Sequence, residues 1–313
     1  MSDNKSDQQH MDDEIDLKEL FAVLWSGKWL ISAVTGVAAI LSIFFALSLP
    51  NIYTANAVLA PADDGESGLS GLLERYGGLA SAAGISLPGA GGGNQTNYAL
   101  QLMKSRKFVG SFVERHDILP ELMAVESWDR ATDTVSFDDD MFLSDTGEWI
   151  RDVRLPFKSR PSMLEAHEEF LEIMSVEEDK VTGYIELSID HHSPAVAAQW
   201  VNWLVEDINA VVKAQDVDEA TKSIEYLTQQ IANTSLADLQ AMFFELIQSQ
   251  TETVMLAEVR PEYVFKTIDP AVVPEEKSKP SRALICVLGT RRGGMLSVVI
   301  VLIRHYAQSE AAD

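Results

Sequence analysis

Histidines and clustered aspartates are the residues of this sequence whose types and spacing first suggest chemistry. His191 and His192 offer imidazole ligands to a metal, but adjacent residues of a strand point to opposite faces, and no third ligand is suitably spaced. Carboxylates that a calcium ion would accept come from Asp138, Asp139, Asp140 and Asp145. The EF-hand spacing and its glycine are missing there, which favours a solvated loop. We therefore predict no metal site.

Clustered glycines are the second candidate, at Gly89, Gly91, Gly92 and Gly93. A phosphate-binding loop needs a Gly-Lys-Ser/Thr after the glycines and a strand before them, and the sequence has neither here. The surrounding stretch 65–93 is rich in Gly, Ala and Ser, which indicates a flexible linker. There is no local Ser–His–Asp motif, and paired carboxylates are too common in this chain to discriminate. We predict no catalytic residue and no cofactor.

The charge of the chain excludes nucleic acid as a partner. Its 313 residues carry a formal net charge of −24, whereas a phosphate-binding surface needs clustered Lys and Arg. Nearly all of this charge lies in residues 50–282, with 39 acidic against 18 basic side chains. Cys286 is the single cysteine, so no intramolecular disulfide can form.

Residues 29–49 form an uncharged apolar run long enough to cross a membrane. At about 1.5 Å per residue, the run spans a hydrocarbon core of roughly 30 Å. A cleaved signal peptide is the alternative, with a conceivable site at Ala46-Leu47-Ser48. Its apolar core would be shorter and preceded by basic residues, but residues 1–28 carry seven acidic residues against three lysines. We predict a retained transmembrane helix.

Residues 283–303 form a second apolar run, which contains Arg291 and Arg292 at its middle. Eleven Leu, Ile and Val residues contribute about −0.3 to −0.6 kcal/mol each, and the two arginines cost roughly 2.5 to 3.5 kcal/mol each. The sum is close to zero, and neither run contains an acidic partner. We predict a second span that inserts only marginally by itself.

Small residues in the two runs indicate close helix packing. Gly289, Gly293 and Gly294 include a Gly-xxx-Gly spacing, which allows two helices to approach each other in a membrane. We predict that this small-residue face packs against Ser32 and Gly36 of the first run.

The segment between the runs reads as an α+β domain with a long projecting helix. Strands are expected at 52–60, 181–189 and 263–274, a helical stripe at 100–116 and loops at 126–160. From Pro194 a helix of about 58 Å is predicted to 232. A second helix is predicted over 235–258, with Ser235 and Asp238 as its Ser-x-x-Asp start.

Several stretches resemble one family of membrane proteins. DDEIDLKELFAVLWSGKWLI, YTANAVLAPA, the stretch from SIEYLTQQI to ALICVLGT and the run GGMLSVVIVLIRHY look like the bacterial polysaccharide co-polymerases, the chain-length determinant proteins. The most specific part is DPAVVPEEKSKPSRAL, where Pro270, Pro274 and Pro280 match the proline-rich lead-in to the family's second span. Arg291 and Arg292 depart from the family pattern, which is apolar there.

The resemblance implies a non-enzymatic protein of the bacterial inner membrane. It implies a cytoplasmic tail at 1–28, spans at 29–49 and 283–303, a periplasmic domain at 50–282 and a cytoplasmic tail at 304–313. Family members form homo-oligomeric rings and set the length of O-antigen or a related polysaccharide made by a separate polymerase. The implied partners are other copies of the chain, that polymerase and, as a further candidate, the growing polysaccharide. The missing phosphate loop excludes the members that carry a tyrosine kinase domain.

Two other classes of function remain open. A two-span periplasmic sensor would need a cytoplasmic output domain, and ten residues after Ile303 do not supply one. An adaptor of an export or efflux complex would place a helical hairpin between repeated strands of a lipoyl-like domain, and the sequence shows no such repeat.

Overall fold

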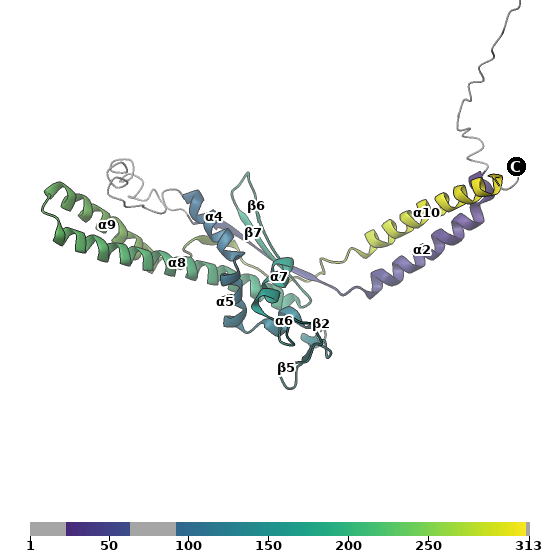
Figure 1. The fold of residues 1–313 in the computed structure, drawn as a ribbon, viewed down its shortest axis with the longest axis horizontal. Coiled ribbons are helices and arrows are strands. Elements are labelled where there is room, and N and C mark those ends of the chain that lie inside the picture. The colour runs from purple at the N-terminus through teal and green to yellow at the C-terminus, as the bar shows by residue number, and fades with distance from the viewer. Residues whose placement is uncertain (1–22, 63–91, 311–313) are drawn as a thin grey trace, which may run out of the picture. The chain divides into compact units, whose positions relative to one another are not determined.

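The computed structural model describes residues 23–62 and 92–310 and divides into two compact units (Figure 1). One unit combines Met1–Pro50 with Pro280–Asp313, and the other is Asn51–Lys279. Residues 65–91 of the predicted linker 65–93 and most of the N-terminal tail lie outside the described residues. An α+β domain with a long helix and two apolar helices near the chain ends confirms the predicted fold class.

The first unit is a pair of apolar helices, α2 (Lys28–Ser48) and α10 (Arg282–Glu310). Lys28–Ser48 and Arg282–Arg304 are both long and apolar enough to cross a membrane, and most of each helix surface is exposed. That exposure distinguishes them from the core helices of a soluble protein, which hide their apolar side chains inside the fold. Gly27 at one end of α2 packs against Val301, and Ser42 near the other end packs against Gly289, so the pair is antiparallel.

The second unit is built on a four-stranded antiparallel sheet in the order β6-β7-β1-β8. The strands are β1 (Tyr53–Pro61), β6 (Met174–Glu178), β7 (Ile185–His191) and β8 (Phe265–Asp269). β7 alternates as predicted, because Ile185, Leu187 and Ile189 are buried and Glu186 is exposed. β8 ends at Asp269, earlier than the predicted strand, which continued into Pro270 and therefore into a residue that cannot donate to a ladder.

The main hydrophobic core lies between this sheet, the long helix α8 (Pro194–Asn233) and four shorter helices. They are α4 (Gly92–Met103), α5 (Arg106–His116), α6 (Leu119–Met123) and α7 (Met163–Ile173). The single helical stripe predicted at 100–116 is interrupted, because Ser105 leaves the helical conformation and caps α5 by accepting a hydrogen bond from the Phe108 N–H. Phe112, Phe170 and Trp200 pack their rings together at the centre of this core.

The long helix α8 (Pro194–Asn233) begins at the predicted proline, with Ser193 as its N-cap. The second helix α9 (Ala237–Val259) returns beside it and forms a hairpin that extends beyond the sheet (Figure 1). Leu227, Met242, Phe243 and Leu246 give this hairpin a small core of its own. The predicted Ser235–Asp238 start is wrong, because the chain stays extended through Leu236 and no side chain caps α9.

Residues 125–149, where loops were expected, instead form two short hairpins. One pairs β2 (Val125–Asp129) with β3 (Thr134–Phe137), and the other pairs β4 (Phe142–Leu143) with β5 (Glu148–Trp149). The ring of Phe142 packs against Trp149 of its own hairpin and against Phe137 of the other, and the second contact joins the two hairpins. Each of these strands is short and pairs only with its neighbour in the hairpin. Its alternation of apolar and polar residues is therefore too brief to recognise among the scattered polar residues.

Candidate functional site

Small residues bring α2 and α10 into direct contact. A Cβ atom added at Gly289 would overlap the Ser42 side chain, and one added at Gly293 would overlap the Ala38 Cβ. The hydroxyls of Thr35 and Ser297 lie 3.5 Å apart across the same interface. The glycines therefore allow a close approach that any larger residue would prevent.

The partners of these glycines on α2 differ from those predicted. Gly289 and Gly293 lie in the interface and Gly294 lies at its edge near Thr35. Ser32 is exposed, and a Cβ at Gly36 would meet nothing within 4 Å. Since successive residues are separated by about 100° on a helix, the face formed by Thr35, Ala38 and Ser42 turns Ser32 and Gly36 away from α10.

Arg282 fastens the end of the helix pair where α10 begins. Its Nε donates to the Ala46 carbonyl at 3.1 Å and its Nη2 to the Leu49 carbonyl at 3.4 Å. The last carbonyls of a helix have no partner within the helix and carry partial negative charge, so a guanidinium stabilises them. From the sequence alone, Arg282 is only a positive charge that flanks the second apolar run.

Arg291 and Arg292 are both exposed and turn away from α2. Arg292 lies about 100° and Arg291 about 160° around the helix from Gly293, which faces α2. None of the ion pairs among the described residues involves either arginine. The first span therefore does not neutralise them.

The three prolines border the segment that leads from β8 to α10. Pro270 directly follows β8, Pro274 is half-buried within the segment, and Pro280 lies two residues before α10. Residues 278–279 are fixed to the start of the sheet, since the Ile52 and Lys279 backbones exchange hydrogen bonds and the Ser278 Oγ accepts from the Thr54 N–H. The segment is thus tied at both ends, by the pairing of β8 with β1 and by the bonds of residues 278–279.

Two asparagines on α8 hold the chain on either side of β8. Asn202 both donates to the Ala271 carbonyl and accepts from its N–H. Asn209, which is buried, donates to the Val205 and Phe265 carbonyls and accepts from the Val264 and Phe265 N–H groups. The sequence interpretation missed this pair, although two asparagines seven residues apart share one helix face.

A charged cluster connects α5 to α8. Asp207 is buried and accepts from Arg115 at 2.7 Å, while its other oxygen lies 3.1 Å from the His116 Nε2. The His116 ring stacks on Trp203 with centroids 4.1 Å apart. All of these groups are engaged in fixing one helix against another, which is a structural role.

The two candidate histidines also have a structural environment. The Ser193 N–H donates to the Nδ1 of His191, so Nε2 carries the proton and donates to the Glu121 carbonyl at 3.0 Å. Burial lowers the pKa of His191 to about 4 and also lowers the pKa of His192. Within the described ranges, no three His, Cys, Asp or Glu side chains are grouped to hold a metal ion.

Comparisons with known proteins match both ends of the chain. The chain length determinant protein (Wzz) family model matches residues 13–116. The model of the "G-rich domain on putative tyrosine kinase" (GNVR) matches residues 240–306. Together the two matches cover more than half of the chain and include both apolar helices.

Similar solved structures include a full-length bacterial polysaccharide co-polymerase. It is 14% identical with a TM-score of 0.39, over 95% of this chain and 100% of that chain. A fragment of WzzB, a polysaccharide co-polymerase from Salmonella Typhimurium, is 12% identical with a TM-score of 0.27, over 73% of this chain and 100% of that chain. Comparison with curated protein sequences gives no match.

The chain has an α+β domain between two apolar helices, and a long helical hairpin extends from that domain. These features define a class of two-span membrane-anchored proteins. The two matched segments make the class specific: residues 13–116 match the Wzz chain length determinant family, and residues 240–306 match the GNVR domain.

Proposed function

We propose that this protein regulates the chain length of lipopolysaccharide O-antigen or a related surface polysaccharide by acting on a separate membrane polymerase. The observation that carries the proposal is the family match at both ends of the chain, including the apolar helices. In this proposal the protein is not an enzyme, because the polymerase performs the glycosyl transfer. The described polar clusters, at Asp207, Asn209 and His191, all bind the protein's own backbone or side chains.

The proposed location is the bacterial inner membrane. Two antiparallel spans put both chain ends on one side of the membrane, and we propose that this side is the cytoplasm, with residues 50–282 in the periplasm. Labelling with a membrane-impermeant thiol reagent tests this arrangement. A cysteine at the exposed Val181 should react in intact spheroplasts, whereas a cysteine at Ser2 should react only after lysis.

The proposed working form is a ring of identical copies. Large apolar side chains remain exposed along the α8–α9 hairpin, at Tyr226, Leu236, Phe244, Met255 and Val259. A hairpin this long has too little core of its own to cover them, and a second copy would cover them. Light scattering of the detergent-solubilised protein should give a multiple of the 34.5 kDa chain, and a monomer at every concentration would refute this point.

The decisive experiment is a size ladder of surface polysaccharide from cells with and without the gene. Loss of a preferred length in the deletion strain, restored by the full chain, supports the proposal. The alternatives predict other results: a changed export of drugs or ions with an unchanged ladder favours an adaptor. A changed transcriptional response with an unchanged ladder favours a sensor. The one sheet that joins β7 and β8 through β1 gives the hairpin a base unlike repeated lipoyl-like strands.

A further inference from the structure

Residues 150–161, which we call the basic loop, carry a net positive charge, whereas the domain that contains them is acidic. They include four basic residues, Arg151, Arg154, Lys158 and Arg160, against the single acidic Asp152. The other residues of 50–282 carry 14 basic against 38 acidic side chains. A local excess of cations in so acidic a domain indicates an anionic partner for this loop.

The tip of the basic loop is apolar and exposed. The Phe157 N–H donates to the Arg154 carbonyl at 3.1 Å, which closes a turn with Leu155 and Pro156 at its apex. Leu155 is 93% exposed and Phe157 is 51% exposed. Cations therefore flank two large apolar side chains that contact little of the protein.

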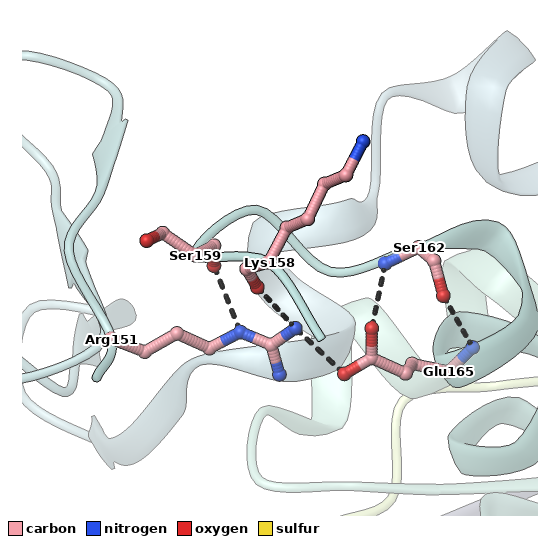
Figure 2. Close-up of polar contacts among 5 residues, drawn as sticks. All are labelled: Arg151, Lys158, Ser159, Ser162 and Glu165. Carbon is pink, nitrogen blue, oxygen red and sulfur yellow. Dashed lines mark hydrogen bonds and ion pairs between the residues drawn. The ribbon is translucent and has the colours of Figure 1, made fainter. Parts of the chain in front are cut away.

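The loop is held in this conformation from within (Figure 2). The Arg151 guanidinium donates to the Ser159 carbonyl at 2.8 Å, to the Lys158 carbonyl at 2.9 Å and to Glu165 at 2.6 Å. Burial alone would raise the pKa of Glu165, but the Ser162 N–H and Arg151 lower it overall, so the carboxylate stays charged. Figure 2 shows the Lys158 ammonium directed away from this cluster, which leaves it available to an external group.

Ring contacts through two hairpins connect the base of the loop to the end of the sheet where the chain arrives from the first span. Tyr53, the first residue of β1, packs edge-on against Trp128 of the β2–β3 hairpin, with centroids 5.3 Å apart. That hairpin contacts the β4–β5 hairpin, from which the loop emerges after Trp149. Only Leu49–Ile52 separate Tyr53 from the end of α2, so these residues span at most about 17 Å.

We propose that the basic loop docks on anionic phospholipid headgroups of the membrane that the two spans cross. Arg154, Lys158 and Arg160 contact the phosphates, and Leu155 and Phe157 enter the boundary between headgroups and acyl chains. Apolar side chains flanked by cations are the composition that binds this interface. A purely acidic protein surface would match the cations but would leave the apolar tip in water. The inference rests on the membrane arrangement proposed above and not on polymerase control.

Spin-label depth measurement on the full chain in nanodiscs tests the proposal. With Cys286→Ser as background, a label at Leu155→Cys is compared in discs of phosphatidylcholine and in discs that also contain phosphatidylglycerol. In the anionic discs the label should lose accessibility to a water-soluble nickel chelate and gain accessibility to oxygen. High salt should reverse the change, because salt screens exposed charges.

Matched variants separate the loop's charge from the charge of the whole protein. Arg154, Lys158 and Arg160 all changed to Gln should return the label to water while Arg151 still holds the loop, since Lys158 contributes only its backbone carbonyl there. Changing the exposed Lys180, Lys222 and Lys266 to Gln removes the same charge elsewhere and should leave the label in the lipid. A label at Val181→Cys, 94% exposed between β6 and β7, should stay aqueous in both lipids.

Two results would overturn the proposal. One is a label at residue 155 that is equally accessible to nickel in both lipids and in the Gln variant. The other is protection that appears only when discs hold more than one copy, which would assign the loop to a neighbouring protomer. A label at Ile300→Cys in α10 reports separately on the span, so failure of the membrane arrangement is distinguishable from failure of the loop.

Discussion

Asn209 uses its whole hydrogen-bonding capacity to hold the long helix to the last strand. Changing Asn209 to Leu would leave the buried N–H groups of Val264 and Phe265 and the Phe265 carbonyl without that partner, and each such group costs about 1 to 3 kcal/mol. We expect a loss of about 3 kcal/mol or more in the free energy of unfolding. Urea denaturation of the detergent-solubilised protein, followed by tryptophan fluorescence, measures it.

Asn202 provides the control for Asn209, because it is only half-buried itself and makes one bond in each direction, both to the backbone of Ala271. Changing Asn202 to Leu should cost about 1 kcal/mol, since water can replace those partners more readily. Equal losses for the two variants would show that burial of Asn209 contributes nothing.

His191 makes the stability of the domain depend on pH. Burial lowers its pKa in the folded protein to about 4, below the ordinary value of 6.5, so the folded state favours the neutral ring. Its stabilising contribution is complete above about pH 6.5 and is lost as the pH falls toward 4, about 3 kcal/mol in all. Burial raises the pKa of Glu121, which acts with the opposite sign. The difference between wild type and His191→Gln across this range therefore isolates His191, and parallel curves would contradict the assignment.

At the scale of elements, α2 and α10 depend on one glycine face. Changing Gly289 and Gly293 to Leu should force the helices apart, because their side chains would occupy the space of Ser42 and Ala38. Disulfide trapping between cysteines at Gly27 and Val301, in a Cys286→Ser background, measures the approach and should fall several-fold. Gly36→Leu is the matched control, since a side chain there meets nothing.

Arg291 and Arg292 lie on the same helix, α10, but they face away from α2. Because α2 does not neutralise them, changing Arg291 and Arg292 to Leu should raise insertion of the span, by removing a cost of roughly 5 to 7 kcal/mol. Glycosylation mapping of the span measures insertion. Full insertion of the isolated Arg-containing span would refute the claim that it is marginal.

The effect on polysaccharide length separates two explanations of the arginines. If a partner in the membrane receives them, the Leu variant should lose or shift length control. If the pair only damages an apolar helix, length control should improve. Protein levels of both forms must be equal for the comparison to hold.

At this scale, the features that could be predicted from the sequence are those with a strong local signal. The two apolar runs, the start of α8 at Pro194 and the alternation in β7 depend on composition and period, which are local. The rotation of α2 about its axis, the break at Ser105 and the bonds of Asn209 depend on what each element meets in space. Tertiary contacts decide such features, and a single sequence does not contain them explicitly.

At the scale of the whole molecule, the prolines connect the domain to the second span. Proline fixes φ near −65° and donates no backbone hydrogen bond, so Pro270, Pro274 and Pro280 stiffen their segment. Replacing all three with Ala should alter the modal length of the polysaccharide while the protein is still produced in normal amounts. If the size ladder of the polysaccharide is unchanged, the prolines only mark the boundary between a strand and a helix.

The position of β1 at the centre of the sheet has a consequence for biogenesis. β1 ends at Pro61, yet its neighbours are β7, which begins at Ile185, and β8, which begins at Phe265. At about 5 to 20 residues per second, ribosomes need roughly 10 to 40 s to make the chain between β1 and β8. Pairings so distant in sequence raise the contact order, and such sheets form slowly. Both edges of β1 are open until β7 is made, and the edge that β8 will occupy stays open longer, so the nascent chain is prone to misassociate until its last strand arrives.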